Sequence, residues 1–261
     1  MSSQRTDMFA ERVHVVFNDR ELERITDFVI RGNADRVYYF KFQKGDVPDA
    51  NLHFWKINHE VLRKQLPRAK IIDLDVDYTD YFQIIQELSK IIREERERNP
   101  KTQIFINLGP GSKVCTIASM DAANLWGAET YYVYSDDYDS NRPEGEPYHK
   151  GEMKSYRMPR FPITRPGKRM IKILKIIGEG GERGVLKKEL IERLKQKGLL
   201  SVTVRPGGNE KAALYMALNN GVLRPLRENW NAVEVTPQRR NQRVRLTQVG
   251  EDMVRVFRYY E

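Results

Sequence analysis

Hydrophobic and polar positions follow two different periods along the first half of the chain. Short apolar runs rich in β-branched and aromatic residues predict strands, and apolar residues spaced three or four apart predict helices. We expect strands at 12–18, 36–42, 69–76, 102–108 and 129–135, and helices at 19–33, 52–66, 77–98 and 112–126. This regular alternation predicts a parallel sheet with helices on both faces.

Sheets of this kind bind ligands at the carboxyl ends of their strands, where the strand order reverses. If the strands at 12–18 and 102–108 are neighbours, the loops that follow them meet at that edge. The first of these loops carries Asn18 and Asp19, and the fifth strand ends nearby in Ser135. The sequence therefore predicts a ligand crevice between these three segments.

The loop after the fourth strand reads N-L-G-P-G-S-K and runs directly into a predicted helix. Backbone N–H groups at a helix N-terminus are unpaired, the helix dipole adds partial positive charge there, and glycines let a ligand approach the backbone. Gly and Pro alone would favour a simple tight turn. The hydroxyl of Ser112 and the ammonium of Lys113 at the helix start favour an anion site instead. The residues that we expect to bind a ligand are Asn18, Asp19, Asn107, Gly109, Gly111, Ser112, Lys113 and Ser135.

Two common phosphate motifs do not fit this loop. A Walker A loop needs a different spacing between its glycines and its lysine, and Val114 stands where that motif has a hydroxyl. A dinucleotide fingerprint follows the first strand, whereas Gly109 and Gly111 follow the fourth. The loop is therefore suited to a phosphate but belongs to neither class.

A different order of elements follows a linker at 160–168 that contains two prolines. We expect helices at 168–184, 185–200 and 209–226, β-like runs at 231–236 and 243–247 around a polar tip, and a last helix at 248–260. This order is that of a winged helix-turn-helix domain, and the ending R-V-R-L-T-Q-V-G-E-D-M-V-R-V-F resembles the wing strand and final helix of winged-helix transcription factors. One departure is the segment at 199–208, which is longer than the usual turn of a helix-turn-helix.

In such a domain the third helix enters the major groove of DNA and the wing reaches a minor groove or phosphates. We expect the third helix to start at Asn209 as its N-cap and to end near Gly221. The residues that we expect to contact DNA are Lys211, Tyr215 and Asn219 on this helix and Arg239, Arg240 and Arg243 on the wing.

The charge of the chain is uneven. Residues 1–161 hold 24 Lys and Arg against 26 Asp and Glu, and residues 162–261 hold 21 against 10. A near-neutral half joined to a half of net charge +11 indicates that the second half meets a polyanion such as nucleic acid. The alternative is an ordinary solvated basic surface.

Other features exclude several classes of protein. The sequence contains no apolar run of the roughly 18 residues that a membrane span needs, and its first residues do not resemble a secretory signal. Cys115 is the only cysteine, which excludes an internal disulfide, and the four histidines have no zinc-like spacing. We therefore expect a cytoplasmic protein with no membrane partner, no bound metal, no cofactor and no catalytic residue.

The segment INLGPGSKVCTIASMDAANLWGAETYYVYS resembles the fourth strand, loop, helix and fifth strand of CARF domains, which are CRISPR-associated Rossmann-fold sensors of cyclic oligoadenylates. The matching features are Asn107, the glycine turn with Ser112 and Lys113, the alanine-rich helix and the aromatic strand. The resemblance implies a homodimer whose two pockets join across a two-fold axis. It also implies a cyclic tetra- or hexa-adenylate as the ligand.

The complete pattern predicts an α/β Rossmann-like parallel sheet domain of the CARF type over residues 1–160, followed by a mainly α winged-helix domain over residues 161–261. This order resembles archaeal CRISPR-associated transcriptional regulators. We therefore expect a dimeric regulator that binds double-stranded DNA in response to its ligand. Two alternatives stay open: a metal-independent ring nuclease that cleaves its own cyclic ligand, and an adaptor whose winged helix binds protein.

Overall fold

The computed structural model describes residues 9–160, 164–205, 207–237 and 241–259. These residues form two compact units, which divide between residues 163 and 164, close to the domain boundary expected at 160 and 161. Each unit is described here by itself.

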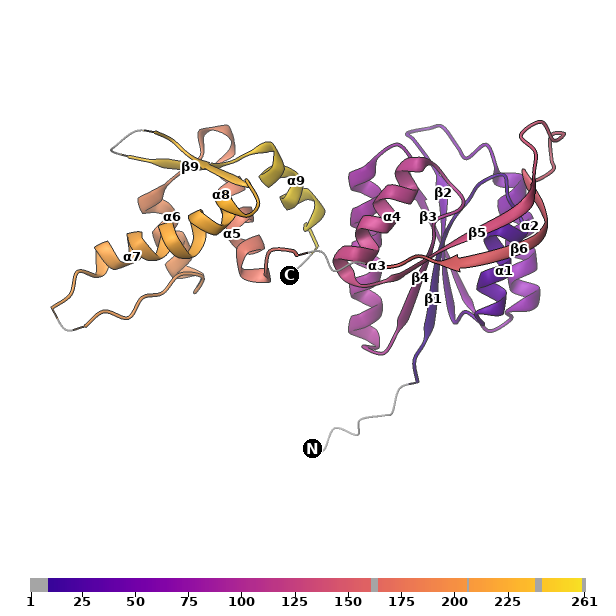
Figure 1. Cartoon of the computed structure of the whole chain (residues 1–261), viewed down its shortest axis with the longest axis horizontal. Coiled ribbons are helices and arrows are strands. Elements are labelled where there is room, and N and C mark those ends of the chain that lie inside the picture. The colour runs from indigo at the N-terminus through magenta and orange to yellow at the C-terminus, as the bar shows by residue number, and fades with distance from the viewer. Residues whose placement is uncertain (1–8, 161–163, 206, 238–240, 260–261) are drawn as a thin grey trace. The chain divides into compact units, whose positions relative to one another are not determined.

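The first unit alternates strands and helices in the order that the hydrophobic pattern predicts (Figure 1). Its elements are β1 (Arg12–Phe17), α1 (Glu23–Arg31), β2 (Arg36–Phe42), α2 (Leu52–Gln65), β3 (Lys70–Val76), α3 (Tyr81–Arg98), β4 (Gln103–Asn107), α4 (Lys113–Trp126), β5 (Glu129–Tyr138) and β6 (His149–Arg157).

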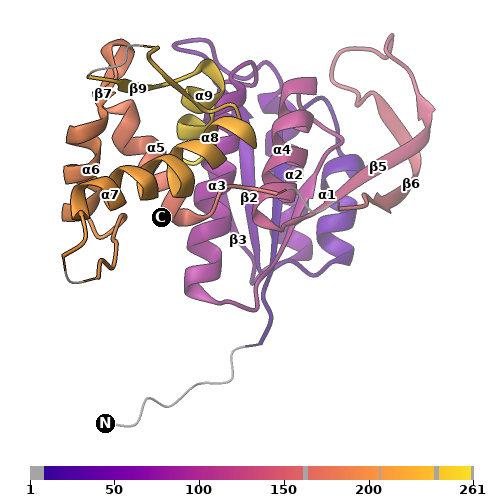
Figure 2. The ribbon, with the colours of Figure 1, turned by 60° about the vertical axis from the view of Figure 1, so that its left-hand side comes forward.

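The sheet has the strand order β3-β2-β1-β4-β5-β6, in which all neighbouring pairs are parallel except β5 and β6. Helices α1 and α2 cover one face, and α3 and α4 cover the other (Figures 1 and 2). The predicted α/β sheet class is confirmed, and so is the pairing of the strands at 12–18 and 102–108.

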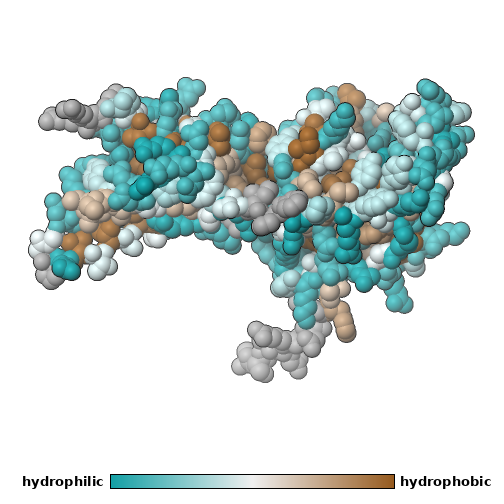
Figure 3. Space-filling view, viewed as in Figure 1, coloured by the Kyte–Doolittle hydropathy of each residue, from teal (hydrophilic) through white to brown (hydrophobic). Residues whose placement is uncertain are grey.

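The core of this unit lies between the sheet and its helices. The strand residues Val15 and Ile106 are fully buried, as are Ala118 and Ala122 of α4. Alanine has a small side chain, so α4 can pack close to the sheet. The face of the molecule seen in Figure 3 is mostly hydrophilic over this unit, which matches the burial of its apolar side chains.

The sequence pattern did not predict the last strand, β6. Charged and exposed side chains dominate this strand, and it pairs antiparallel with β5, where Tyr132 faces Tyr156. An exposed edge strand has no apolar run to mark it, so periodicity fails there.

The second unit contains a helical bundle and a small sheet. Its elements are α5 (Lys168–Gly178), η1 (Gly181–Arg183), β7 (Val185–Leu186), α6 (Lys187–Gln196), α7 (Glu210–Leu218), η2 (Asn219–Leu223), α8 (Arg224–Glu228), β8 (Val233–Val235), β9 (Arg243–Leu246) and α9 (Gln248–Val256). The strands form a sheet in the order β7-β9-β8. This order of elements is that of a winged helix domain, and that part of the prediction is confirmed.

The third helix of this unit differs from the prediction. The predicted range 209–226 is close to the observed one, but the stop expected at Gly221 is wrong. The chain continues from α7 through the π-helical turn η2 into α8, and we call residues 210–228 the long helix. Pro225 has no N–H to donate to the carbonyl of Gly221, and within the π turn the N–H of Arg224 donates to the carbonyl of Asn219 instead. The helix therefore passes through Gly221 and Pro225 by widening one turn.

The predicted apolar stripes of the second unit form one core. Leu174, Ile177, Leu190, Leu194 and Leu218 are all buried in it. The described residues of the long segment between α6 and α7 contain no helix or strand.

Candidate functional site

Strand order in the first unit reverses at β1, which pairs with β2 on one side and β4 on the other. The loops after β1 and β4 therefore meet at the carboxyl edge of the sheet. The contact is direct, because the N–H of Gly111 donates to Oδ2 of Asp19 at 3.0 Å. Two of the predicted ligand-binding segments are thus brought together, and we call this place the crevice.

The glycine loop is held by its own strand. Asn107 is fully buried; its Oδ1 accepts the N–H of Gly109 at 2.9 Å, and its Nδ2 donates to the carbonyl of Arg24 at 3.0 Å. Gly111 has a φ of 86°, and a Cβ there would lie 3.1 Å from the Cβ of Phe17. The loop therefore needs a glycine at position 111 for both its backbone conformation and its closeness to β1.

Ser112 and Lys113 start helix α4. The Oγ of Ser112 accepts the N–H of Cys115 at 3.1 Å as an N-cap and donates to the carbonyl of Tyr78 at 2.6 Å. The side chain of Lys113 is exposed and has no ion pair or hydrogen bond with the residues that the structure describes. Because helical side chains lean toward the N-terminus of their helix, the ammonium of Lys113 is available to a ligand at that end.

The carboxylate of Asp19 contacts the backbone of the glycine loop. Besides the N–H of Gly111, it accepts the N–H of Arg20 at 2.8 Å. Burial raises the pKa of Asp19, while these two backbone hydrogen bonds act in the opposite direction. The loop amide that sequence reasoning assigned to a ligand therefore already has an acceptor from the protein.

Asn18 and Ser135 are buried and satisfied within the unit. Nδ2 of Asn18 donates to Asp49 at 2.9 Å, and the hydroxyl of Tyr39 donates to Oδ1 of Asn18 at 3.1 Å. The hydroxyl of Ser135 donates to the carbonyl of Lys150. A ligand would reach either side chain only by displacing these partners.

A cluster of ionisable side chains beside the crevice was missed by sequence reasoning. We call the buried Glu21 and Arg24, together with the half-buried Tyr132 and His149 that they contact, the buried quartet. Arg24 lies 3.2 Å from Glu21, donates to the hydroxyl of Tyr132 at 2.7 Å, and its Nε would lie 3.1 Å from a Cβ at Gly109. The Nδ1 of His149 lies 2.5 Å from Oε1 of Glu21. The quartet therefore borders the glycine loop.

Below neutral pH, the shifted pKa values place a proton on the carboxyl group of Glu21 and none on the imidazole of His149. Burial raises the pKa of Glu21 to about 7, against the influence of Arg24. Burial and the charge of Arg24 lower the pKa of His149 to about 4. A neutral carboxyl next to a neutral imidazole explains how both groups can be buried beside a guanidinium. Glu21 and His149 are far apart in sequence, so no local motif reveals the pair.

The predicted DNA contacts fall in three environments. Lys211 is exposed on α7, whereas Tyr215 is half-buried and packs against the core. Asn219 accepts a hydrogen bond from Lys187 at 2.9 Å, and Arg243 donates to the carbonyl of Gly184 at 2.8 Å. The side chain of Arg243 thus has a partner within the fold. Arg239 and Arg240 lie outside the described residues.

Membrane-spanning helices and clusters of metal ligands are both absent from the residues that the structure describes. No helix there has both the length and the apolar character that crossing a bilayer requires. Across the same described ranges, no three His, Cys, Asp or Glu side chains group in a way that could hold a metal ion.

Two family models match separate parts of the chain. Residues 12–138 match a model described as HFX_2341_N-like, N-terminal, and residues 169–258 match the DUF6293 C-terminal winged helix domain. An uncharacterized protein of Methanocaldococcus jannaschii is 26% identical over 222 residues, which are 73% of this chain and 63% of that protein. The chain thus spans less than two thirds of this relative.

Two solved structures are similar at low identity. Csm6 of Enterococcus italicus bound to cyclic hexa-2'-fluoro-hexa-dAMP is 12% identical with a TM-score of 0.41, over 49% of this chain and 34% of that one. Can2 from Sulfobacillus thermosulfidooxidans in complex with cyclic tetra-adenylate is 16% identical with a TM-score of 0.36, over 96% of this chain and 66% of that one.

The strand order of the first unit, the element order of the second and the two matching models agree with the fold predicted from the sequence. The chain joins an α/β domain that matches the HFX_2341_N-like N-terminal model to a winged helix domain that matches the DUF6293 C-terminal model.

Proposed function

We propose that this protein is a ligand-responsive regulator that binds double-stranded DNA. The observation that carries the ligand half of the proposal is Lys113, an exposed ammonium at the start of α4 where the strand order reverses. The ligand that we propose is a cyclic tetra- or hexa-adenylate, whose phosphates would meet Lys113 and the first N–H groups of α4.

The geometry divides the predicted ligand residues by role. We propose that Asn107, Asp19 and Ser112 shape the loop through their hydrogen bonds, because each already has partners in the protein. Lys113 then carries the contact with phosphate. This division predicts that replacing Lys113 weakens ligand binding while the fold is unchanged.

A homodimer fits a cyclic ligand, because two crevices related by a two-fold axis present the same groups to both sides of a ring. The exposed side chain of Ile117 lies one turn after Lys113 on α4 and is 57% exposed. An exposed large apolar residue beside the proposed ligand contact supports a partner surface there.

The test is a calorimetric titration of the full chain with cyclic tetra-adenylate and cyclic hexa-adenylate. We expect one ring per dimer and an affinity that falls about tenfold or more in Lys113→Ala, since a charge-assisted hydrogen bond contributes about 1.5–3 kcal/mol. Lys56→Ala is the matched control, because Lys56 is an exposed lysine on α2, on the other face of the sheet. If neither ring binds the wild type, the ligand proposal is wrong.

The DNA half of the proposal rests on the winged helix fold and its charge. Binding to a duplex should weaken steeply as salt increases, because counterions are released when phosphates are neutralised. A dimer should prefer two half-sites about 34–36 Å apart or a multiple of that distance. Binding that is insensitive to salt, or no binding to DNA, would favour the protein-binding adaptor.

The buried quartet supports a second candidate function, cleavage of the bound ring. In that reaction the 2′-oxygen bonds to the adjacent phosphorus while a base takes the 2′-proton. The bond from phosphorus to the 5′-oxygen breaks, and the 5′-oxygen leaves as a hydroxyl after taking a proton from water. A neutral His149, which lies 3.4 Å from the Arg24 that borders the glycine loop, offers a base that the sequence did not reveal. Incubation of the protein with either ring tests this candidate: linear products that disappear in His149→Gln support cleavage, and intact rings contradict it.

A further inference from the structure

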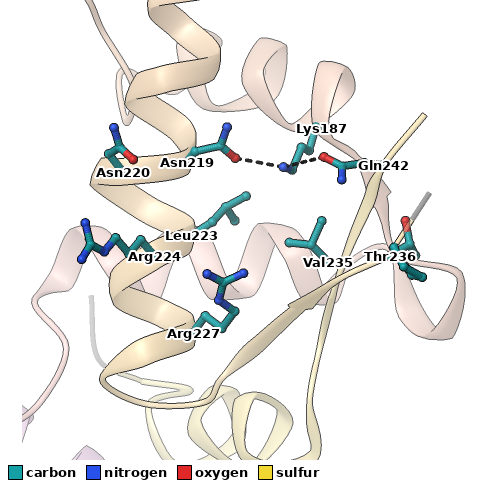
Figure 4. Close-up of a pocket in the computed structure, with 10 residues that line it drawn as sticks. Lys187, Asn219, Asn220, Leu223, Arg224, Arg227, Val235, Thr236 and Gln242 are labelled. Carbon is teal, nitrogen blue, oxygen red and sulfur yellow. Dashed lines mark hydrogen bonds between the residues drawn. The ribbon is translucent and has the colours of Figure 1, made fainter. Parts of the chain in front are cut away.

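A cavity of about 380 Å³ lies in the winged helix domain between the long helix and the wing. Its walls are the start of α6, the π turn with α8, and β8 with the residues that flank it (Figure 4). We call it the cationic cavity. None of the ligand-binding residues predicted from the crevice lies in it.

The charge of this cavity is one-sided. Lys187, Arg224 and Arg227 line it, and no Asp or Glu is among its described lining residues. Glu228 lies outside the lining and pairs with Arg224 at 2.9 Å and with Arg227 at 3.7 Å. One nearby carboxylate against three cations leaves a surplus of positive charge at the cavity.

Lys187 shows the surplus most clearly. Its ammonium is half-buried and donates to Oδ1 of Asn219 at 2.9 Å and Oε1 of Gln242 at 2.8 Å, both neutral amide oxygens. An ammonium has three N–H donors, so one remains for a ligand. Burial lowers the pKa of Lys187, and the charge of Arg227 lowers it further. A bound anion would relieve both effects.

The π turn arranges the helix side of the cavity. Asn219, Leu223 and Arg227 lie on the side of the long helix that faces Val235, while Arg224 lies on its outer side (Figure 4). The guanidinium of Arg227 is thus directed into the cavity. Turns of this kind occur frequently at functional sites.

A neighbouring groove of the same domain makes a useful contrast. It has a volume of about 310 Å³ and is lined by three lysines together with Glu192 and Glu210. One of its lysines, Lys195, pairs with Glu210 at 2.9 Å. Positive charge in that groove is largely compensated, whereas in the cationic cavity it is not.

We propose that the cationic cavity binds a phosphate group. Guanidinium groups bind phosphate through two parallel hydrogen bonds, and a lysine adds a point charge. The cavity is within the range of about 300–1,000 Å³ that is usual for small-molecule sites, so it admits a group as large as a mononucleotide. The phosphate can come from a free nucleotide or from the backbone of duplex DNA. Only the second source rests on the proposed function.

The test uses the full chain and two probes, adenosine 5′-monophosphate and a mixed-sequence duplex. We compare wild type with Lys187→Gln and Arg227→Gln, and with Lys197→Gln as a control, because Lys197 is an exposed lysine outside the cavity. Arg227 has a side chain that is 59% exposed, so its variant should fold even if the variant at Lys187 does not.

If a nucleotide is the source, both cavity variants weaken binding of the monophosphate about tenfold, and the control changes it less than about twofold. If DNA is the source, each cavity variant lowers the salt slope of duplex binding by about one, and the monophosphate does not bind. Binding of the monophosphate without any binding of DNA supports this proposal and contradicts the proposed DNA-binding function. DNA binding that both cavity variants leave unchanged, with no monophosphate binding, overturns this proposal alone.

Discussion

The two domains treat charge in the protein interior differently. In the α/β domain, Arg36 is nearly buried and pairs with the fully buried Glu95 at 2.7 Å and with Glu11 at 2.5 Å. In the winged helix domain, the half-buried Lys187 has two amide oxygens in place of a carboxylate. Charges that are compensated internally hold a fold together, whereas an uncompensated cation is available to a ligand. We therefore expect that removing a charge damages stability in the first domain and binding in the second.

The largest expected effect concerns the buried ion pairs of the α/β domain. Glu95→Ala removes the fully buried one of the two carboxylates that pair with Arg36, and the hydroxyl of Tyr38 loses its acceptor as well. It should destabilise the protein by about 3–5 kcal/mol, because buried polar and charged groups lose their partner. Urea unfolding of the full chain measures it. Glu97→Ala is the control, since that side chain is 69% exposed, and it should change stability by no more than about 0.5 kcal/mol. Equal effects of the two changes would contradict the comparison.

The next effect concerns the pH dependence of the buried quartet. The pKa of Glu21 is raised from its ordinary value of 4.5 to about 7, so it contributes stability that is lost as the pH rises through this range. The pKa of His149 is lowered from 6.5 to about 4, so its contribution is lost as the pH falls through that range. In the wild type, these two contributions therefore change the stability in opposite directions as the pH rises.

Replacing one of the two groups at a time should separate their effects on the pH dependence of stability. In His149→Gln only the carboxyl remains, and stability should fall by about 2–3 kcal/mol as the pH rises from 4.5 to 7. In Glu21→Gln only the imidazole remains, and stability should rise as the pH rises from about 4 to 6.5. Thermal unfolding across this range measures both. Slopes of the same sign would contradict the opposite pKa shifts of the two groups.

A smaller effect on stability is expected for Lys187, whose partners in the winged helix domain are two amide oxygens. Lys187→Gln should change the free energy of unfolding by less than about 1 kcal/mol, because it leaves no buried charge without a partner. The same urea titration measures it, with wild type and Glu95→Ala as references. A loss as large as that of Glu95→Ala would mean that Lys187 is structural and would remove the contrast between the domains.

The smallest effect sharpens the charge argument for the cationic cavity. Glu228→Gln removes the one carboxylate that pairs with Arg224 and Arg227, so a phosphate there should bind about two- to threefold more tightly. Titration with adenosine 5′-monophosphate, or with duplex if the nucleotide does not bind, measures the change. Glu251→Gln, an exposed carboxylate on α9, should have no effect. Weaker binding in Glu228→Gln would mean that the pair itself shapes the site.

The sequence predicts those parts of the fold that depend on local periodicity. Five strands of the α/β sheet and the apolar stripes of the second domain follow from the spacing of hydrophobic residues. The exposed edge strand β6 and the π turn have no such signal, since one lacks an apolar face and the other continues an unbroken apolar stripe.

The candidate site was predictable only in part. Parallel sheets bind ligands where their strand order reverses, which predicts that the loops after β1 and β4 meet. The contact of Asp19 with Gly111 agrees with this prediction. The pairing of Glu21 with His149 depends on the return of β6 beside α1, which no spacing along the chain expresses. Tertiary contacts, not motifs, therefore decide which polar side chains are free to meet a ligand.

The π turn at Asn219–Leu223 also sets the angular phase of the helix that follows it. Each residue advances an α-helix by about 100° around its axis, so a chain shorter by one residue in this turn would rotate everything after it by that angle. Arg224 and Arg227 would each then point away from the side that it now faces, although the sequence of α8 would be the same. Deleting a single residue here would rotate the cationic side chains of α8 about the helix axis, with little change in composition or charge.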